Sequence, residues 1–552
     1  MLLTGAQIIM ECLLEQEVDT IFGYPGGQIM PLYDALYTYT QDGRIKHILT
    51  AHEQGATHAA DGYARSSGRV GVCFATSGPG ATNTVTGIAS ANIDSSPMVV
   101  ITGQVPVDSI GRDAFQEVDI VGITLPITKH SYAIRKVEEI APAIRSAFQI
   151  AKSGRPGAVL VDVPKNLMVA TCEYEKSAPL KTIHAPEVNP KRIQKLAEMI
   201  NEAERPVLYA GGGVNISNAS KELTELAHKS NIPVVTTLMC LGCFARSDSL
   251  SLGIPGMHGE KEANLAIHNS DLLISVGARF SDRVTGNPDG FAVGAKVVHI
   301  DIDHSEINKN IDSSLRIVGD VKDVLQVLLP KVKKNKRKEW LSQINDWKRP
   351  ATKNSDFTPE NILHTINEIM GEDTIVATDV GQHQMWTAQK WSFEKPRKFI
   401  TSGGMGTMGF GMGAAIGAKI ANPDKRVILI SGDGSFRMNM NELITASIND
   451  LPIIVFVLKN GTLGMVRQWQ KLFFDKRYSA TDLTDIIDYS MLAESFGLKG
   501  CEVTSIDELK DAIDKAKSFD KATVIACDIF IDENVWPIVP PGDNIDNQRI
   551  SE

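Results

Sequence analysis

The stretch Val427-Ile428-Leu429-Ile430-Ser431-Gly432-Asp433-Gly434-Ser435 joins a short apolar run to a glycine-rich turn. Apolar runs of this length, rich in β-branched residues, are typical of buried strands in parallel sheets. Similar runs recur along the chain and alternate with helical patterns; they cover residues 70–75, 98–102, 158–163, 207–209, 272–276, 297–302, 374–378, 453–458 and 523–528. This alternation predicts an α/β protein built from doubly wound parallel sheets.

The length of the chain predicts several domains. A chain of 552 residues is too long for one hydrophobic core, because cores seldom grow beyond about 250 to 300 residues. Charged residues and proline replace the apolar rhythm in residues 171–190 and 331–358, which we interpret as linkers. We therefore expect three doubly wound domains and a polar tail. The domains cover residues 1–170, 190–330 and 358–535.

Composition excludes several classes of partner. The net charge is -10, and the one short basic run, residues 331–338, is typical of a solvated linker, so we expect no nucleic-acid partner. No apolar run approaches the roughly 18 residues that cross a bilayer, and no basic segment followed by an apolar run opens the sequence. We expect no membrane contact and a cytoplasmic location.

Seven cysteines scattered over the chain form neither a disulfide framework nor a zinc pattern. Cys240 and Cys243 have the spacing of a redox pair, which leaves a catalytic disulfide as an alternative. They follow the strand-like residues 233–237 in a glycine-bearing stretch and do not begin a helix. We therefore favour buried thiols.

Two strand-end turns provide candidate metal ligands. Asp433 follows the strand at 427–431, and Asn460 follows the strand at 453–458. Neighbouring parallel strands would place both side chains at one sheet edge, where their oxygens suit Mg²⁺ completed by phosphate and water. A glycine on each side of Asp433 would let backbone amides approach a phosphate. Taken alone, Gly-Asp-Gly is more often an ordinary turn.

The two turns together resemble the diphosphate-and-metal motif of thiamine-diphosphate enzymes. The resemblance implies that Asp433, Asn460 and the backbone carbonyl of Thr462 bind Mg²⁺. The family usually has two consecutive asparagines, and Lys459 replaces the first of them. Because the ligand is the second, we expect Lys459 to leave the metal in place.

Residues 51–65 resemble the glutamate-bearing helix of the same enzymes, in which a carboxyl group activates the aminopyrimidine ring of the cofactor. Glu53 is the corresponding residue. The alternative is a solvent-facing or helix-capping glutamate. The small neighbours Gly55, Ala56 and Ala59 favour a tightly packed helix, in which a carboxylate needs a partner.

The chain as a whole resembles the acetohydroxyacid synthase family, through the turns at 23–27, 76–83, 381–383 and 403–409. In this family each site lies across a dimer interface, so the resemblance implies a homodimer or homotetramer, and a small regulatory subunit is possible. The thiamine-diphosphate contacts that it implies are Pro25, Gly26, Asn83, Gln382, His383, Gly406, Met408, Gly432, Gly434, Ser435 and Met465.

Residues 278–286 resemble the flavin-associated motif of the biosynthetic synthases, with Ser281 in place of a usual aspartate. The resemblance implies bound FAD without a net redox role. Cys240 and Cys243, which replace the usual glycine and alanine, would lie at the flavin edge. The implied FAD contacts are Arg155, Gly211, Gly212, Gly213, Thr237, Leu238, Met257, His258, Gly277, Arg279, Asp301, Ile302, Asp303, Glu306 and Asp320.

The resemblance also implies the reaction. Pyruvate is decarboxylated on thiamine diphosphate, and the two-carbon unit passes to pyruvate or 2-ketobutyrate, the first common step of branched-chain amino acid biosynthesis. The alternatives are a related flavin enzyme such as pyruvate oxidase, or an inactive nucleotide-binding scaffold. The implied catalytic residues besides Glu53 are Gln116 and Lys165, and the substrate contacts are Phe115, Arg283 and Trp469.

Two departures from the family pattern bear on selectivity and rigidity. Leu125 stands where an arginine is common, and Met412-Gly413 where Leu-Pro is common. We expect neither to affect the metal ligands or Glu53.

Overall fold

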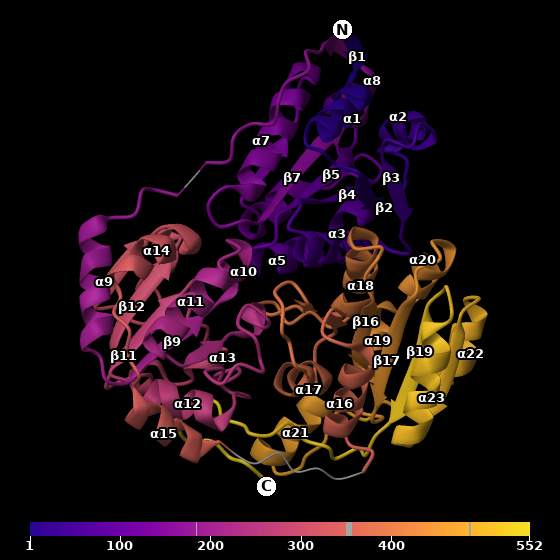
Figure 1. Cartoon of the computed structure of the whole chain (residues 1–552). Helices are drawn as coiled ribbons and strands as arrows, with labels where there is room; N and C mark the ends of the chain where they lie inside the picture. The colour runs from indigo at the N-terminus through magenta and orange to yellow at the C-terminus, as the bar shows by residue number, and fades with distance from the viewer. Residues whose placement is uncertain (184, 349–355, 485–486, 552) are drawn as a thin grey trace.

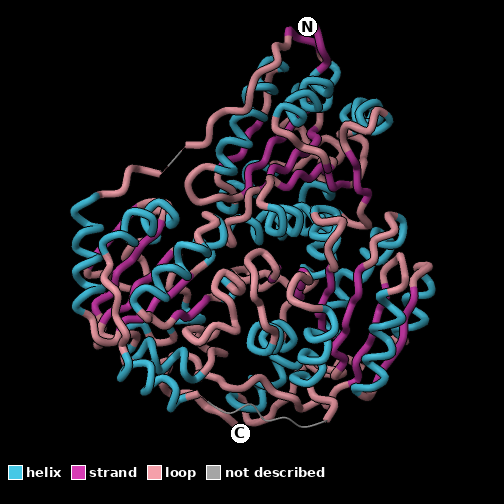
Figure 2. Tube along the Cα trace, in the orientation of Figure 1, coloured by secondary structure: helices cyan, strands magenta, loops and turns pink. Residues whose placement is uncertain are grey.

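The computed structural model describes residues 1–183, 185–348, 356–484 and 487–551. Three parallel sheets dominate it, and helices cover both faces of each (Figures 1 and 2). The predicted doubly wound α/β architecture is confirmed. Each of the ten predicted strands coincides with an observed strand, within one or two residues at its ends.

The first sheet has six strands in the order β3-β2-β4-β5-β7-β6. A short antiparallel pair, β1 and β8, brings the start of the chain against its exit from this unit. The strands are β1 (Leu2–Thr4), β2 (Thr20–Gly23), β3 (Lys46–Leu49), β4 (Gly71–Ala75), β5 (Met98–Gln104), β6 (His130–Ala133), β7 (Ala158–Pro164) and β8 (Thr171–Glu173). The helices are α1 (Gly5–Glu15), α2 (Met30–Gln41), α3 (Glu53–Ser67), α4 (Pro79–Asn83), α5 (Val85–Ile93), α6 (Ile120–Thr124), α7 (Ile140–Lys152) and α8 (Lys165–Val169).

The second sheet has five strands in the order β10-β9-β11-β12-β13. They are β9 (Pro206–Ala210), β10 (Val234–Thr236), β11 (Leu272–Val276), β12 (Lys296–Asp301) and β13 (Leu315–Val318). The helices are α9 (Pro190–Glu202), α10 (Gly212–Ile216), α11 (Ser220–Ser230), α12 (Lys261–His268), α13 (Asp282–Thr285), α14 (Val321–Leu328) and α15 (Lys338–Trp347).

The third sheet has six strands in the order β15-β14-β16-β17-β19-β18. They are β14 (Ile375–Thr378), β15 (Phe399–Ile400), β16 (Val427–Gly432), β17 (Ile453–Lys459), β18 (Lys499–Val503) and β19 (Thr523–Asp528). The helices are α16 (Pro359–Met370), α17 (Gln382–Lys390), α18 (Phe410–Ala421), α19 (Asp433–Asn439), α20 (Leu443–Ile448), α21 (Gly464–Phe473), α22 (Tyr489–Ser495) and α23 (Ile506–Lys517).

Helices α3 and α18 join the first unit to the third. A side-chain carbon at Gly62 would lie 2.2 Å from the carbonyl oxygen of Ala414, and one at Gly417 would lie 1.8 Å from that of Ala59. Glycine is therefore required where the two backbones cross. One buried cluster runs through the crossing and unites side chains of both units.

Two sequence predictions fail outside the sheets. Helix α15 lies inside the predicted linker 331–358; it buries Trp340 and Ile344, whose helical spacing is masked by charged neighbours. Residues 349–355 of that linker, and residue 184 of the linker 171–190, lie outside the described residues. The expected polar tail instead packs on the second unit, where Val539 donates its N–H to the carbonyl of Met257 at 2.7 Å and Ile545 is buried.

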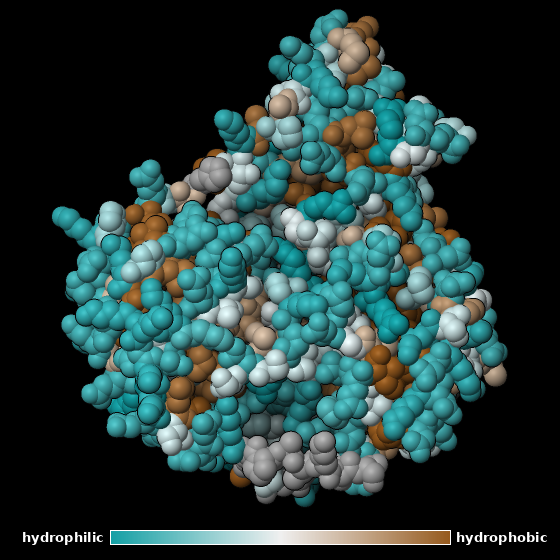
Figure 3. Space-filling model, viewed as in Figure 1, coloured by the Kyte–Doolittle hydropathy of each residue, from teal (hydrophilic) through white to brown (hydrophobic). Residues whose placement is uncertain are grey.

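The face seen in Figure 3 is mostly hydrophilic. Within the described residues, no helix combines the length and the apolar character needed to cross a membrane.

Candidate functional site

The carboxyl ends of β16 and β17 form the floor of a pocket. The two strands pair in parallel with Gly432 opposite Leu458, so the residues that follow them, Asp433 and Asn460, lie at one sheet edge. The Asp433 carboxylate accepts N–H groups from Gly434 at 2.9 Å and from Gly461 at 2.7 Å. Helix α19 begins at Asp433 itself.

Most of the predicted thiamine-diphosphate and metal residues of the third unit line this pocket. Gly406 lies in the loop before Met408 and does not line it. The predicted residues in the lining are Gln382, His383, Met408, Gly432, Asp433, Gly434, Ser435, Asn460, Thr462 and Met465.

The groups that line the pocket suit a diphosphate. The Nε2 atom of His383 is buried without a hydrogen-bond partner, and burial lowers the pKa of this side chain to about 3, so the ring is neutral. A side-chain carbon at Gly432 would lie 2.8 Å from His383 Nδ1, so only glycine leaves the cradle open. The oxygens of Asp433, Asn460 and Thr462 are donors that suit Mg²⁺ when phosphate completes its coordination.

Lys459 does not intrude on this pocket. Its ammonium lies 3.2 Å from the Glu502 carboxylate on β18. The pocket lining includes Asn460 and omits Lys459.

Glu53 belongs to a separate cluster in the first unit. It is the first residue of α3, is 9% exposed, and accepts a hydrogen bond from Asn83 Nδ2 at 3.0 Å. A side-chain carbon at Gly80 would lie 3.1 Å from Glu53 Oε1.

The two predicted pyrimidine turns lie together. Gly26 packs on Thr76, and the Thr76 hydroxyl accepts the N–H of Gln28. Pro25 is exposed beside them.

A buried carboxylate of the third unit fixes the start of α3. Glu442 accepts the N–H groups of Ala51 at 3.2 Å and of His52 at 3.0 Å, and the Thr445 hydroxyl at 2.6 Å. Burial raises the pKa of Glu442. A side-chain carbon at Gly55 would lie 2.0 Å from its Oε1. No local motif marks Glu442 in the sequence, because its partners Ala51 and His52 lie in a different domain.

The loop that carries Phe115 and Gln116 borders the Glu53 cluster. A side-chain carbon at Gly78 would lie 2.9 Å from the Cβ of Gln116, whose φ is 61°. Phe115 is 83% exposed, and Lys165 begins α8 without a described contact to Glu53. Of the described residues, none from this first unit lines the diphosphate pocket. The Glu53 cluster and the diphosphate pocket are thus separate within the described part of the chain.

Asp162 supports this loop through Gln104, and no local motif marks Asp162 in the sequence. Gln104 Nε2 donates to Asp162 at 3.0 Å and to the carbonyl of Val118 at 2.8 Å, and the Thr102 hydroxyl donates to Asp162 at 2.7 Å. Burial raises the pKa of Asp162 to about 7.

A second cleft, of about 490 Å³, lies at the carboxyl ends of the strands of the second sheet. This is the edge where doubly wound sheets bind ligands. A side-chain carbon at Gly211 would lie 2.2 Å from the carbonyl oxygen of Gly277, so the backbones there approach closely. Burial raises the pKa of Asp301 to about 6. The predicted FAD contacts in its lining are Arg155, Gly211, Gly212, Gly213, Thr237, Leu238, Gly277, Arg279, Asp301, Ile302, Glu306 and Asp320.

Three predicted FAD residues lie outside that lining. Asp303 lies 3.7 Å from Arg155, and Met257 donates its N–H to the carbonyl of Arg283 at 2.8 Å. Burial lowers the pKa of His258 to about 4, and its carbonyl receives Gln389 Nε2 at 2.8 Å.

The residues that depart from the family pattern have local explanations. Ser281 caps α13 and borders the cleft. Cys240 and Cys243 are buried free thiols, and neither borders the cleft, although Thr237 and Leu238 before them do. Leu125 is exposed, and Gly413 lies against the backbone of α3.

Arg283 and Trp469 meet across the second and third units. The guanidinium carbon lies 5.9 Å from the centre of the indole ring. Arg283 also borders the cleft, whereas Trp469 is half-buried on α21.

Three family descriptions match the chain, in the order of the three sheets. The N-terminal TPP binding domain of thiamine pyrophosphate enzymes matches residues 3–123, their central domain residues 193–328, and their C-terminal TPP binding domain residues 379–527.

Curated relatives match almost the whole chain. A probable acetolactate synthase large subunit of Methanocaldococcus jannaschii is 47% identical, over 98% of this chain and 94% of the relative. The acetolactate synthase isozyme 2 large subunit of Escherichia coli is 46% identical, over 98% of each chain. The acetolactate synthase large subunit of Corynebacterium glutamicum is 46% identical, over 98% of this chain and 89% of the relative.

Proposed function

The chain belongs to the thiamine pyrophosphate enzymes, among their acetolactate synthase large subunits, and from this we propose that it condenses two 2-keto acids with loss of carbon dioxide. The donor is pyruvate, and the acceptor is pyruvate or 2-ketobutyrate. The observation that carries the proposal is the pocket after β16 and β17, whose donors and glycines suit a metal-bound diphosphate. The names of the relatives do not favour pyruvate oxidase.

The chain's own residues bind and orient the cofactor. Bound thiamine diphosphate supplies a carbon nucleophile and an electron sink for the decarboxylation of a 2-keto acid. Asp433, Asn460 and the Thr462 carbonyl would hold Mg²⁺, and His383 and the amides after Gly432 would contact the diphosphate. Glu53 would hold its carboxyl proton toward the aminopyrimidine ring of the bound cofactor, and Asn83 would keep the carboxyl group oriented.

FAD is proposed for the second cleft. The glycines of residues 211–213 and Gly277 let a flat or phosphorylated group approach the backbone, and Arg155 provides a cation. The flavin has no net redox part in the reaction. Residues 1–170, 190–330 and 358–535 are proposed as the pyrimidine-binding, flavin-associated and diphosphate-binding domains.

A homodimer, or a homotetramer built from two such dimers, would complete the site. Because the Glu53 cluster and the diphosphate pocket do not meet within the described part of one chain, the partner subunit would supply the missing half of each site. Arg283, Lys165 and Gln116 are proposed to contact the 2-keto acids, since cations attract their carboxylates. Trp469 and Phe115 are proposed to contact the acceptor. The relatives are named large subunits, which supports a small partner subunit.

Product analysis tests the proposed reaction. The chain is incubated with thiamine diphosphate, Mg²⁺, FAD and pyruvate, with and without 2-ketobutyrate. We expect 2-acetolactate from pyruvate alone and 2-aceto-2-hydroxybutyrate from the mixture. Acetyl phosphate or acetate, together with bleaching of the flavin absorbance, would indicate an oxidase instead.

A further inference from the structure

The loop from Ser402 to Met408 borders both proposed cofactor sites. Gly403 and Gly404 line the cleft proposed for FAD. Met408, at the other end of the loop, lines the diphosphate pocket. The loop is therefore a shared wall of the two sites.

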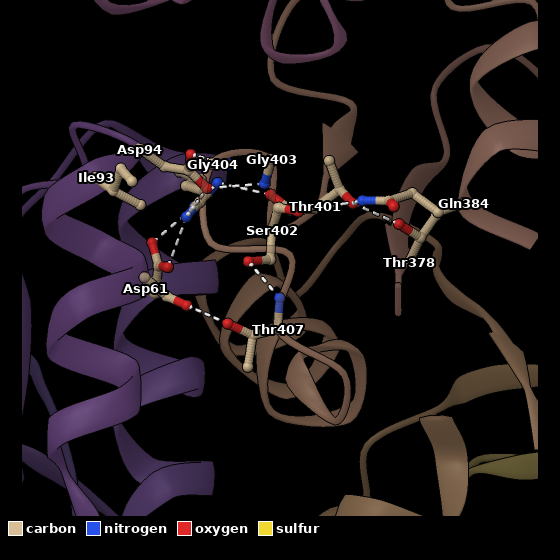
Figure 4. A network of polar contacts seen from close by, with 12 residues as sticks. Asp61, Ile93, Asp94, Thr378, Gln384, Thr401, Ser402, Gly403, Gly404 and Thr407 are labelled. Carbon is tan, nitrogen blue, oxygen red and sulfur yellow. Dashed lines mark hydrogen bonds and ion pairs between the residues drawn. The ribbon is translucent and has the colours of Figure 1, made fainter. Parts of the chain in front are cut away.

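Asp94 of the first domain holds the cleft end of this loop (Figure 4). Its carboxylate accepts the N–H of Gly403 at 2.9 Å and the N–H of Gly404 at 2.7 Å. The Asp94 side chain is itself buried, and the residue borders the cleft together with Gly403 and Gly404. Asp94 also ends helix α5, where a negative charge opposes the helix dipole.

Arg65 of α3 compensates that buried charge. Its guanidinium lies 3.1 Å from the Asp94 carboxylate and 2.7 Å from that of Asp61. It also donates to the carbonyl of Thr401 at 2.7 Å, at the start of the loop. The ion pairs therefore position Asp94 and the loop together.

Helix α5, which ends at Asp94, also holds the end of the loop nearest the diphosphate pocket. The hydroxyls of Ser90 and Thr407 lie 2.6 Å apart, and Thr407 donates its N–H to the hydroxyl of Ser402 at 3.1 Å. Ser90 and Asp94 are four positions apart and share one face of the helix end. Gly406 has a φ of +64°, which favours glycine at the bend between the two attachments.

We propose that Asp94 is a positioning residue that couples the two cofactor sites through this loop. A flavin packed against Gly403 and Gly404 restrains the loop, and the restrained loop presents Met408 to the diphosphate pocket. Binding at either site then strengthens binding at the other, by the same factor in both directions. The inference rests on the proposed function, because it takes the FAD cleft and the thiamine-diphosphate pocket as given.

Calorimetric titration of the flavin-free and the FAD-saturated chain with thiamine diphosphate and Mg²⁺, without substrate, measures the coupling. For the native chain we expect FAD to lower the dissociation constant of thiamine diphosphate by about tenfold, within the range usual for coupled sites. In Asp94→Asn the amide accepts only one of the two N–H groups and lacks the charge opposite Arg65. We expect the factor to fall below about twofold.

Two further variants separate positioning from general stability. Gly404→Ala disrupts the same contact from the side of the loop, because the added carbon would lie 2.9 Å from Asp94 Oδ1. If Asp94→Asn does not fold, this variant tests the coupling in its place. Glu15→Gln breaks a comparable buried pair with Arg145, 2.8 Å long and within the first domain. It should lower the melting temperature and leave the coupling factor unchanged.

Each outcome has a distinct meaning. A native factor near one with both cofactors bound, or an undiminished factor in Asp94→Asn and Gly404→Ala, overturns the coupling and leaves the proposed reaction standing. Failure of the native chain to bind FAD contradicts the FAD part of the proposed function and the coupling with it. Loss of the coupling in Glu15→Gln would also overturn the assignment, since any loosening of the fold would then suffice.

Discussion

The carboxyl group of Glu53 is the residue on which the proposed proton transfer depends. Glutamine keeps an oxygen that accepts the Asn83 amide hydrogen at the observed 3.0 Å contact, so Glu53→Gln should fold and bind thiamine diphosphate. It lacks the carboxyl proton, so kcat should fall by about 100-fold or more, the usual contribution of acid–base catalysis. Steady-state turnover beside a calorimetric cofactor titration checks both expectations. Near-native turnover would remove Glu53 from the mechanism.

Asp162 should make stability depend on pH. Burial raises the pKa of this carboxyl from an ordinary value near 3.8 to about 7. A raised pKa in the folded chain contributes stability below pH 3.8, and this contribution is lost as the pH rises through 7. Urea unfolding between pH 4 and 8 should therefore show native stability falling relative to Asp162→Asn, by at most about 1.4 kcal/mol per pH unit. Parallel curves would contradict a buried proton at Asp162.

Residue roles were predictable where the signal is local. Asp433 and Asn460 each end an apolar strand, and Glu53 sits among small helical residues, so short motifs identified them. Glu442 and Asp94 carry no such motif. They act on amides of other domains, at Ala51, His52, Gly403 and Gly404, and those contacts exist only after the domains pack.

At the scale of elements, the ends of β16 and β17 bring together Asp433 and Asn460, the proposed metal ligands. Because the diphosphate is held partly through the cation, Asp433→Ala and Asn460→Ala should each weaken thiamine diphosphate and Mg²⁺ together, by more than about tenfold. Titration of each ligand at saturating levels of the other measures this linkage. Lys459→Ala is the matched control, since Lys459 pairs with Glu502 outside the pocket. If Asp433→Ala and Asn460→Ala both keep the native affinities for thiamine diphosphate and Mg²⁺, the metal does not bind at these residues.

The crossing of α3 and α18 has no room for a larger residue. A side-chain carbon at Gly417 would lie 1.8 Å from the carbonyl oxygen of Ala59, so Gly417→Ala should cost about 1 to 3 kcal/mol of unfolding free energy, or more. Urea unfolding compares it with Gly294→Ala, whose added carbon has no neighbour closer than 3.7 Å. Equal stability of the two variants would show that the helices separate readily.

Elements were predictable in proportion to their burial. Strands such as β16 are apolar on both faces, so an uninterrupted apolar run predicts them. Helix α15 buries only one stripe, with Trp340 and Ile344, and charged residues interrupt its apolar pattern. The β1–β8 pair and the packed tail escaped prediction because their partners lie far away in the sequence. Local pattern thus predicts an element better than it predicts what that element packs against.

At the scale of the whole molecule, the Glu53 cluster and the diphosphate pocket lie on different domains, so the proposed active site depends on how chains assemble. The pocket behind Asp433 is lined by residues 380–466, and Glu53 lies on another domain of the chain. Exposed apolar side chains accompany the Glu53 domain, including Phe115, Leu125 and Met30. Such side chains are common where a second subunit packs.

Mixing two inactive variants tests whether the site is shared between subunits. In a hybrid dimer of Glu53→Gln and Asp433→Ala chains, one site collects both defects and the other collects none. With random exchange half of the dimers are hybrids, so activity should return to about a quarter of the native value, as two-fold symmetry requires. Tandem affinity tags isolate the hybrid, whose activity should be about half the native value. Asp433→Ala mixed with Asn460→Ala is the control and should stay inactive, because both changes damage the same half-site. If the Glu53→Gln and Asp433→Ala hybrid also stays inactive, both halves of the site must come from one chain.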